Sequence, residues 1–236
     1  MSQAVLVSGI RWVSLRDRLA WRHPEWWSLA LSAVSWVILL TRSRSPHAAH
    51  AIGGMSEWTL MVIAMMVPLS IAPIRVTAER SLWRRRHRAI AEFLAGYVFV
   101  WLVIGAIGVW VLTVLPLVSS VGLKGSTSLG LVAAAAWQLA PAKRRALRAC
   151  HRTAPLAGRG WRADRDCVAY GVTSGGRCVV NCSAMMFACL LSAHSIPVML
   201  SATMVGLAER YASRPVAGHT SAIALASLAL MLNVEF

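Results

Sequence analysis

Sulfur-bearing side chains recur at helical spacing in the segment of residues 171–209. Four of them follow one another at positions i, i+4, i+7 and i+11: Cys178, Cys182, Met185 and Cys189. This spacing places all four on one face of a helix. Thiolates and thioethers are soft ligands, which favour Cu(I) over hard cations. The spacing therefore predicts a Cu(I)-binding face, while ordinary packing by cysteine and methionine is the alternative.

A second run rich in methionine lies upstream, in residues 58–68. Met61 and Met65 share one face of the predicted helix, with Met66 one step round. We expect Met61 and Met65 to face the Cys178–Cys189 stripe, where a mixed thiolate–thioether site would form. Core packing is again the alternative.

Histidines gather in the parts of the chain that are predicted to face outward. His47 and His50 lie three residues apart, and His194 follows the cysteine-bearing run. An i, i+3 pair can hold one metal ion if its segment is helical, and two histidines in a loop can equally be solvated. Glu57 is expected to join this cluster.

Cys150 closes a strongly basic run that contains Lys143 and Arg148. Neighbouring cations lower the pKa of a thiol. Cys150 is therefore predicted to be a cytoplasmic metal ligand with a lowered pKa, and an idle surface thiol is the alternative. All five cysteines are expected to be unpaired, because their spacing forms no disulfide framework.

The composition predicts an all-α, polytopic integral membrane protein. Of 236 residues 57% are hydrophobic and 14% charged, and the mean hydropathy is +0.59. Soluble domains carry roughly a quarter charged residues. After a basic cytoplasmic lead-in, 1–25, apolar runs follow almost to the end, so residues 26–236 are predicted to be a single integral membrane helical domain.

The apolar runs predict about seven spans, or six if short runs are re-entrant. Their ranges are 26–40, 58–74, 90–115, 127–139, 170–193, 196–208 and 221–234. Pro68 and Pro73 should kink the second span, where neighbouring helices can satisfy the freed carbonyl groups. Glycines at 96, 105 and 108 should allow close helix contacts in the third.

The basic residues predict the orientation of these spans. All but three of the 24 Lys and Arg residues fall in segments assigned to the cytoplasm, including 75–88 and an irregular loop at 151–167. The exceptions are Arg42, Arg44 and Lys124. The N-terminus is thus expected inside and the C-terminus outside, with the lipid bilayer as a partner through its anionic headgroups. The same distribution argues against a nucleic-acid partner.

Motifs of common enzyme classes are missing from the sequence. It has no phosphate loop, no Gly-x-Ser-x-Gly and no His-Glu-x-x-His. Glu92 and Glu209 lie close to span ends, whereas a proton-coupled pump usually needs a deeper carboxylate. Catalysis is therefore not the expected role.

Four motifs, which follow one another along the chain, are similar to those of a known protein family. They are GGMSEWTLMVIAMMVPLSIAP (53–73), WQLAPAKRRALRACHR (137–152), GVTSGGRCVVNCSAMMF (171–187) and VMLSATMVGLAER (198–210). They resemble the bacterial family of predicted metal-binding integral membrane proteins, an uncharacterised-domain family sometimes described as copper chaperone-like. The resemblance covers 53–210. It implies copper handling in the cytoplasmic (inner) membrane, as a multi-pass protein that binds or passes Cu(I), with a membrane or periplasmic protein as the partner in copper delivery.

The resemblance also implies a set of ligands. The residues of this sequence that match the family's cysteines and methionines are Cys150, Cys178, Cys182, Met65, Met66 and Met186. This sequence departs from the family's pattern at four positions. Ala146 and Asn181 stand where the family has cysteines, Ser183 stands where it has a tryptophan, and His194 stands where it has a methionine. The alternatives are a non-catalytic scaffold or assembly subunit of a membrane complex and, third, a metal-dependent membrane oxidoreductase.

Overall fold

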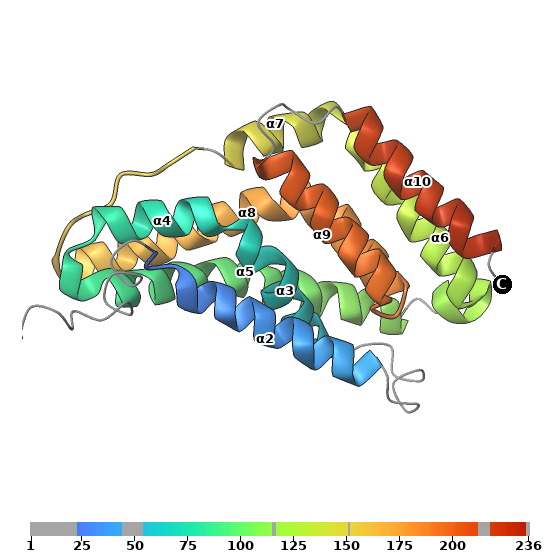
Figure 1. The fold of residues 1–236 in the computed structure, drawn as a ribbon, viewed down its shortest axis with the longest axis horizontal. Coiled ribbons are helices and arrows are strands. Elements are labelled where there is room, and N and C mark those ends of the chain that lie inside the picture. Colours follow the sequence, from blue (N-terminus) through green and yellow to red (C-terminus); the bar gives the residue numbers. More distant parts are fainter. Residues whose placement is uncertain (1–22, 44–53, 115–116, 151, 212–217, 235–236) are drawn as a thin grey trace, which may run out of the picture.

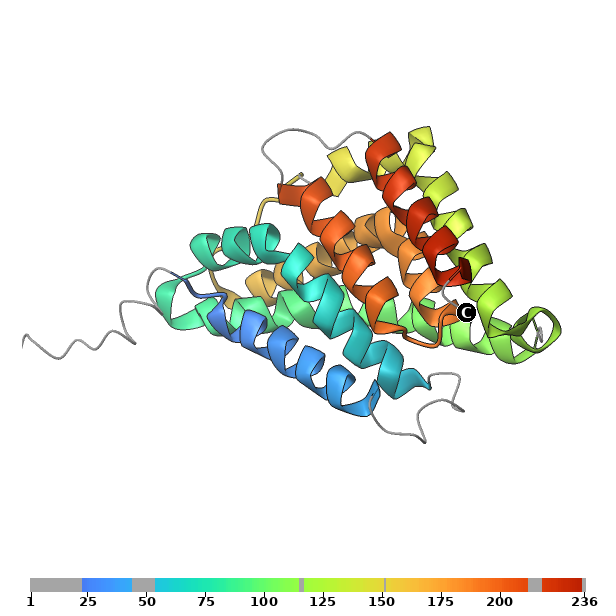
Figure 2. The same cartoon turned by 45° about the vertical axis from the view of Figure 1, so that its right-hand side comes forward.

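The computed structural model describes residues 23–43, 54–114, 117–150, 152–211 and 218–234, and within these ranges it is helical without a strand (Figures 1 and 2). The helices are α2 (Trp26–Ser43), α3 (Met55–Leu69), α4 (Ile71–Arg80), the 3₁₀ turn η2 (Trp83–Arg85), α5 (Arg86–Val114), α6 (Leu117–Leu139), α7 (Pro141–Cys150), α8 (Gly160–Leu191), α9 (Ile196–Tyr211) and α10 (Gly218–Val234). The predicted all-α fold class is confirmed.

Two helical stretches of the described residues, Trp83–Val114 and Gly160–Leu191, are long and apolar enough to cross a membrane. The pair α3 and α4 makes a third if its two helices, bent by 68°, count as one span. α10 is apolar over Gly218–Leu232 but shorter. The arrangement of seven spans therefore stays a prediction.

The bend between α3 and α4 follows from proline, as the sequence predicted. Pro68 has no N–H to donate to the carbonyl of Ala64. The hydroxyl of Ser32 and the indole N–H of Trp36, both on α2, donate to that carbonyl instead, at 2.8 Å and 3.0 Å. A neighbouring helix thus satisfies the carbonyl that the proline frees.

The second proline is accommodated in the same way. Pro73 leaves the carbonyl of Leu69 without its helical donor. The hydroxyl of Tyr211, at the end of α9, donates to that carbonyl at 3.2 Å. Helix α4 then continues to Arg80, so the first part of the basic segment 75–88, which the charge pattern assigned to the cytoplasm, is helical.

α5 and α8 form the longest helix pair and lie side by side in both views (Figures 1 and 2). Glycine makes this approach close. A Cβ at Gly171 of α8 would overlap the carbonyl oxygen of Phe93 on α5, and a Cβ at Gly96 would overlap the carbonyl oxygen of Val168. The prediction that glycines in this helix allow close contacts is confirmed at Gly96 and at the two others, because a Cβ at Gly105 would overlap the ring of Trp58 on α3 and one at Gly108 the ring of Phe187 on α8.

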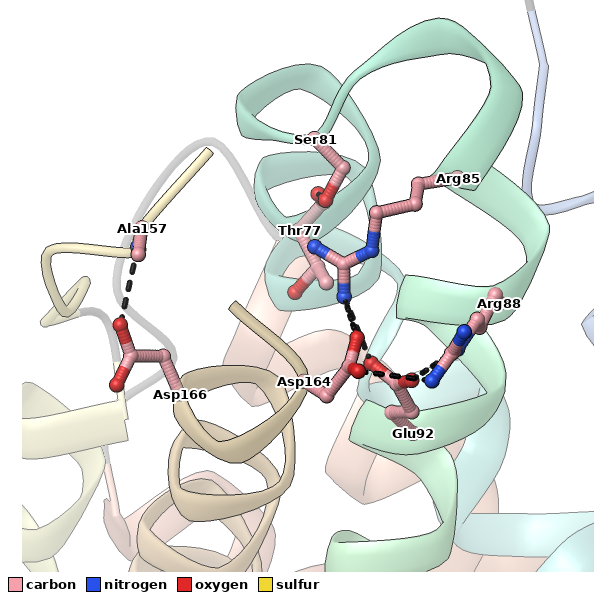
Figure 3. Close-up of polar contacts among 8 residues, drawn as sticks. All are labelled: Thr77, Ser81, Arg85, Arg88, Glu92, Ala157, Asp164 and Asp166. Atoms are coloured by element: carbon pink, nitrogen blue, oxygen red, sulfur yellow. Dashed lines mark hydrogen bonds and ion pairs between the residues drawn. The ribbon is translucent and has the colours of Figure 1, made fainter. Parts of the chain in front are cut away.

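Ion pairs fix the start of α8 on the start of α5 (Figure 3). Arg85 pairs with Glu92 at 3.1 Å and also with Asp164. Arg88 reaches the same two carboxylates at 2.7 Å each. Two arginines from α5 and its preceding turn thereby hold one carboxylate from each helix.

The predicted irregular loop at 151–167 is wrong over its second half. α8 begins at Gly160, ten residues before the predicted span, because the acidic groups of this polar stretch have partners within the fold. Asp164 joins the ion pairs of Figure 3, and Asp166 accepts a hydrogen bond from the backbone N–H of Ala157 at 3.0 Å. A run that reads as solvated loop is thus helical.

Helix α6 also departs from the prediction. It begins at Leu117 rather than near residue 127, and Gly122 breaks its regularity with φ +74°. Lys124, predicted to lie in an outer loop, falls within the helix after that break. α6 and α10 then pack along each other (Figure 1).

Candidate metal centre

The centre is built around two thiols on α8. Cys178 and Cys182 are one helical turn apart and both are buried, and their sulfur atoms lie 3.9 Å from each other. Two sulfurs that bind one ion at about 2.3 Å each, the zinc–thiolate length, lie at most about 4.6 Å apart. The observed separation therefore suits two ligands of one metal ion.

A thioether from α3 completes the sulfur cluster. The sulfur of Met66 lies 4.0 Å from the sulfur of Cys178. The sequence predicted that Met65 and Met61 would face the cysteine stripe, and both are buried in the same core. The methionine sulfur beside Cys178, however, belongs to Met66, one position round the helix.

Tyr97 of α5 places a hydroxyl against the same thiol. Its oxygen lies 3.0 Å from the sulfur of Cys178 and 3.2 Å from the carbonyl oxygen of Met66. The hydroxyl carries one proton, and a charged thiolate would be the stronger acceptor of the two. Tyr97 is therefore a hydrogen-bond donor poised for the deprotonated form of Cys178.

Asn181, the residue before Cys182, contacts the second thiol. Its side-chain nitrogen donates to the sulfur of Cys182 at 3.3 Å, while its Oδ1 is buried without a partner among the described residues. The sulfur of Cys182 keeps a polar neighbour in an otherwise apolar core.

The rest of the stripe extends away from this cluster. Met185 and Met186 are buried about one turn beyond Cys182, and Cys189 is buried about two turns beyond it. The side-chain nitrogen of Gln138 on α6 donates to the sulfur of Met185 at 3.5 Å. Seven residues along a helix span on the order of 10 Å, so Cys189 is too distant to share an ion with Cys182.

Cys150 lies at the end of α7, half-buried, near the Arg210 side chain of α9. Burial raises the pKa of the Cys150 thiol, and the guanidinium of Arg210 opposes that rise. The lowered pKa predicted from its basic neighbours is therefore wrong, because α7 turns its arginines outward while the thiol packs inward. Cys150 also interacts electrostatically with Cys182, but among the described residues it does not make a third cysteine of one metal-holding group.

His194 lies beyond the C-terminal end of α8, where the structure brings it to Glu57 as predicted. The two side chains are 3.9 Å apart. Burial lowers the pKa of His194, and the carboxylate of Glu57 opposes this. Its backbone is left-handed, with φ +59°, and donates to the carbonyl of Cys189 at 2.9 Å. His47 and His50 fall outside the described residues.

The donor set favours a soft monovalent ion. Among the residues that the structure describes, no three His, Cys, Asp or Glu side chains gather into a metal-holding group. What gathers instead is two thiols and a thioether. Cu(I) accepts such soft ligands, whereas structural zinc almost always takes four thiolate, imidazole or carboxylate ligands.

Sequence reasoning missed three polar residues around the sulfur atoms: Tyr97, Gln138 and Arg210. Each carries a hydrogen-bonding group at a position that reads as packing or as a span end. A polar side chain within an apolar run is a signal that could have identified Tyr97 and Gln138. Arg210 offered no such signal, because it falls in a basic segment whose charge was explained by the predicted cytoplasmic side of the membrane.

Comparison with known proteins points to the same cargo. No curated protein and no solved structure matches the chain. A family model described as "PpoB2: Copper chaperone" matches residues 55–232, which include both thiols and Met66. The chain therefore belongs to the PpoB2 copper chaperone family.

Proposed function

We propose that this protein binds Cu(I) between Cys178 and Cys182 in a bacterial cytoplasmic membrane, and passes it to a membrane or periplasmic protein. The observation that carries the proposal is the buried pair of sulfurs 3.9 Å apart, with the sulfur of Met66 at 4.0 Å from the first. The family's description independently supports copper as the cargo.

The surroundings of the thiols suit a charged metal–thiolate group. When both thiols release their protons to solvent and bind Cu(I) as thiolates, the resulting group carries one net negative charge. Unpaired charge is costly in a buried site. Arg210 interacts electrostatically with Cys178, and its Nε has no hydrogen-bond partner among the described residues. Its guanidinium would offset the charge, while Tyr97 donates a hydrogen bond to the thiolate.

Passage of the ion would proceed by exchange of soft ligands. Met185 and Met186 follow Cys182 on α8, and Cys189 follows them toward His194. Thioethers bind Cu(I) weakly enough to release it, and two- or three-coordinate Cu(I) can exchange ligands one at a time. Reduced copper is the state that the cytoplasm maintains, so no electron transfer is required.

Membrane location is supported by the surface as well as by the apolar helices. Large apolar side chains are exposed along α5, α6 and α10, including Phe99, Trp110, Leu129, Ile223 and Leu230. Lipid would cover such surfaces, which are costly in water. A scaffold subunit, whose cysteines only pack, remains the second candidate because the same thiols belong to the apolar core. An oxidoreductase would additionally need an electron donor.

The decisive experiment measures copper retained by the purified protein after anaerobic loading with Cu(I). The Cys178→Ser/Cys182→Ser double variant is expected to lose the bound ion. Cys189→Ser makes the same chemical change on the same helix and should retain it. If the double variant holds as much copper as the wild type, the sulfur atoms have a packing role and the scaffold assignment replaces this one.

A further inference from the structure

A pocket of about 700 Å³ lies where the ends of α6, α7 and α9 meet the start of α10. Seven polar side chains line it: Gln138, Lys143, Arg144, Arg145, Arg148, Glu209 and His219. None of these seven is one of the proposed copper ligands. The pocket therefore needs an account of its own.

The pocket's charge is strongly positive on one wall. Lys143 and Glu209 are both buried, and they pair with nitrogen–oxygen distances of 3.0 Å and 2.8 Å. Their charges offset each other. The three arginines of α7 are exposed, and none has an ion-pair partner among the described residues. They leave an excess of positive charge that suits an anion with several oxygen atoms.

The deeper wall offers a hydrogen-bond acceptor. Gln138 is 2% exposed, and its Oε1 is buried without a partner among the described residues. Its Nε2 is directed to the sulfur of Met185. An unsatisfied buried carbonyl oxygen destabilises a fold, so a ligand hydroxyl at this position would be favourable. Gly218 also lines the pocket, and the N-terminal end of α10 adds partial positive charge there.

Apolar surface continues from the pocket along the two adjoining helices. Leu139 lines the pocket at the end of α6 and is half exposed, and Leu129 and Val132 are exposed further along that helix. Ile223 and Leu230 are exposed on α10, which packs beside α6. A ligand with an anionic head and long apolar chains could therefore bind its head in the pocket and lay its chains along α6 and α10.

We propose that this pocket binds the headgroup of an anionic phospholipid that carries free hydroxyl groups, such as phosphatidylglycerol. The arginines of α7 hold the phosphate, and Gln138 accepts a hydrogen bond from a headgroup hydroxyl. The inference rests on the membrane location given under the proposed function, but it does not depend on copper. The lipid would fasten α7, which packs on α8, to the ends of its neighbours.

The test uses the full-length protein, copper-free, purified in detergent and stripped of lipid. Its thermal unfolding is followed as short-chain phosphatidylglycerol is added, with phosphatidylcholine of the same chains and glycerol 3-phosphate in parallel. The Arg144→Gln/Arg145→Gln/Arg148→Gln variant removes the cationic wall. A matched triple variant at the exposed arginines Arg159, Arg162 and Arg165 removes the same charge at the start of α8.

Phosphatidylglycerol should stabilise the wild type and the matched variant saturably, whereas the pocket variant should bind it more than about tenfold more weakly. Both variants alter exposed side chains, so their unfolding temperatures without lipid should equal that of the wild type. Equal lipid affinity in all three proteins, or equal binding of phosphatidylcholine, would overturn the proposal. Equal affinity for glycerol 3-phosphate would show a site for soluble phosphate esters instead. Copper retention, measured separately, decides the proposed function whatever the lipid does.

Discussion

At the scale of single residues, spacing in the sequence determines one contact of the proposed copper site, that between Cys178 and Cys182, but not the others. Cys178 and Cys182 converge because positions i and i+4 adjoin on any helix. Which methionine meets them depends on how α3 is rotated between α2, α5 and α9. That rotation is set by packing of the whole core, so spacing alone did not determine that the sulfur of Met66 lies beside the sulfur of Cys178.

Tyr97 gives the sharpest test at this scale. Tyr97→Phe removes the hydroxyl that lies 3.0 Å from the sulfur of Cys178 and leaves the ring in place. Because hydrogen bonds to charged groups contribute roughly 1.5–3 kcal/mol, we expect Cu(I) affinity to fall by about tenfold or more. Competition against a Cu(I)-selective chelator would measure it. Tyr170→Phe, at another buried tyrosine facing α5, should bind copper like the wild type. Equal affinity in both variants would remove Tyr97 from the site.

At the scale of elements, the apolar runs predicted most helices but not their ends. Hydrophobic periodicity locates the middle of a helix, whereas α8 extends ten residues earlier through a polar stretch. The ion pairs of Asp164 with Arg85 and Arg88 make that extension favourable, and they join residues far apart in the chain. Such long-range partners are invisible to a local pattern. The kink at Pro68 was predictable because its cause lies within the helix.

The contact between α5 and α8 should depend on glycine at position 171. In Gly171→Ala the new Cβ meets backbone atoms of α5, among them the nitrogen of Tyr97 at 3.0 Å, so the helices must separate. We expect a loss of about 1–3 kcal/mol in unfolding free energy, as in other overpacked cores, and weaker copper binding as Tyr97 shifts. Denaturant unfolding in detergent measures the first effect.

Gly176 provides the matched control on the same helix. A Cβ there would meet no atom within 4 Å. Gly176→Ala should therefore leave stability unchanged or raise it by up to about 1 kcal/mol through helix propensity. If the two alanine variants unfold alike, close packing at Gly171 does not hold α5 and α8 together.

At the scale of the whole molecule, charge and apolar surface divide the protein. Arginines gather on η2, at the start of α5 and along the short helix α7, while the exposed faces of α5, α6 and α10 are apolar. The sequence predicted an orientation from this division but could not determine the number of spans. Whether short and bent helices such as α3 and α4 cross a bilayer or re-enter it depends on the helices that pack around them. A hydropathy pattern does not describe that packing.

The two ends of α8 should lie on opposite sides of the membrane. From Arg162 to Leu191, where α8 ends two residues before Ala193, the helix rise corresponds to about 44 Å, more than the roughly 30 Å of a bilayer core. Arg162 and Ala193 are both exposed. The distribution of basic residues predicts Arg162 in the cytoplasm and Ala193 outside. In a Cys150→Ser background, a membrane-impermeant maleimide should label Ala193→Cys in intact cells and label Arg162→Cys after lysis. The reverse pattern would invert the orientation, and labelling of both positions in intact cells would show that α8 does not span the membrane.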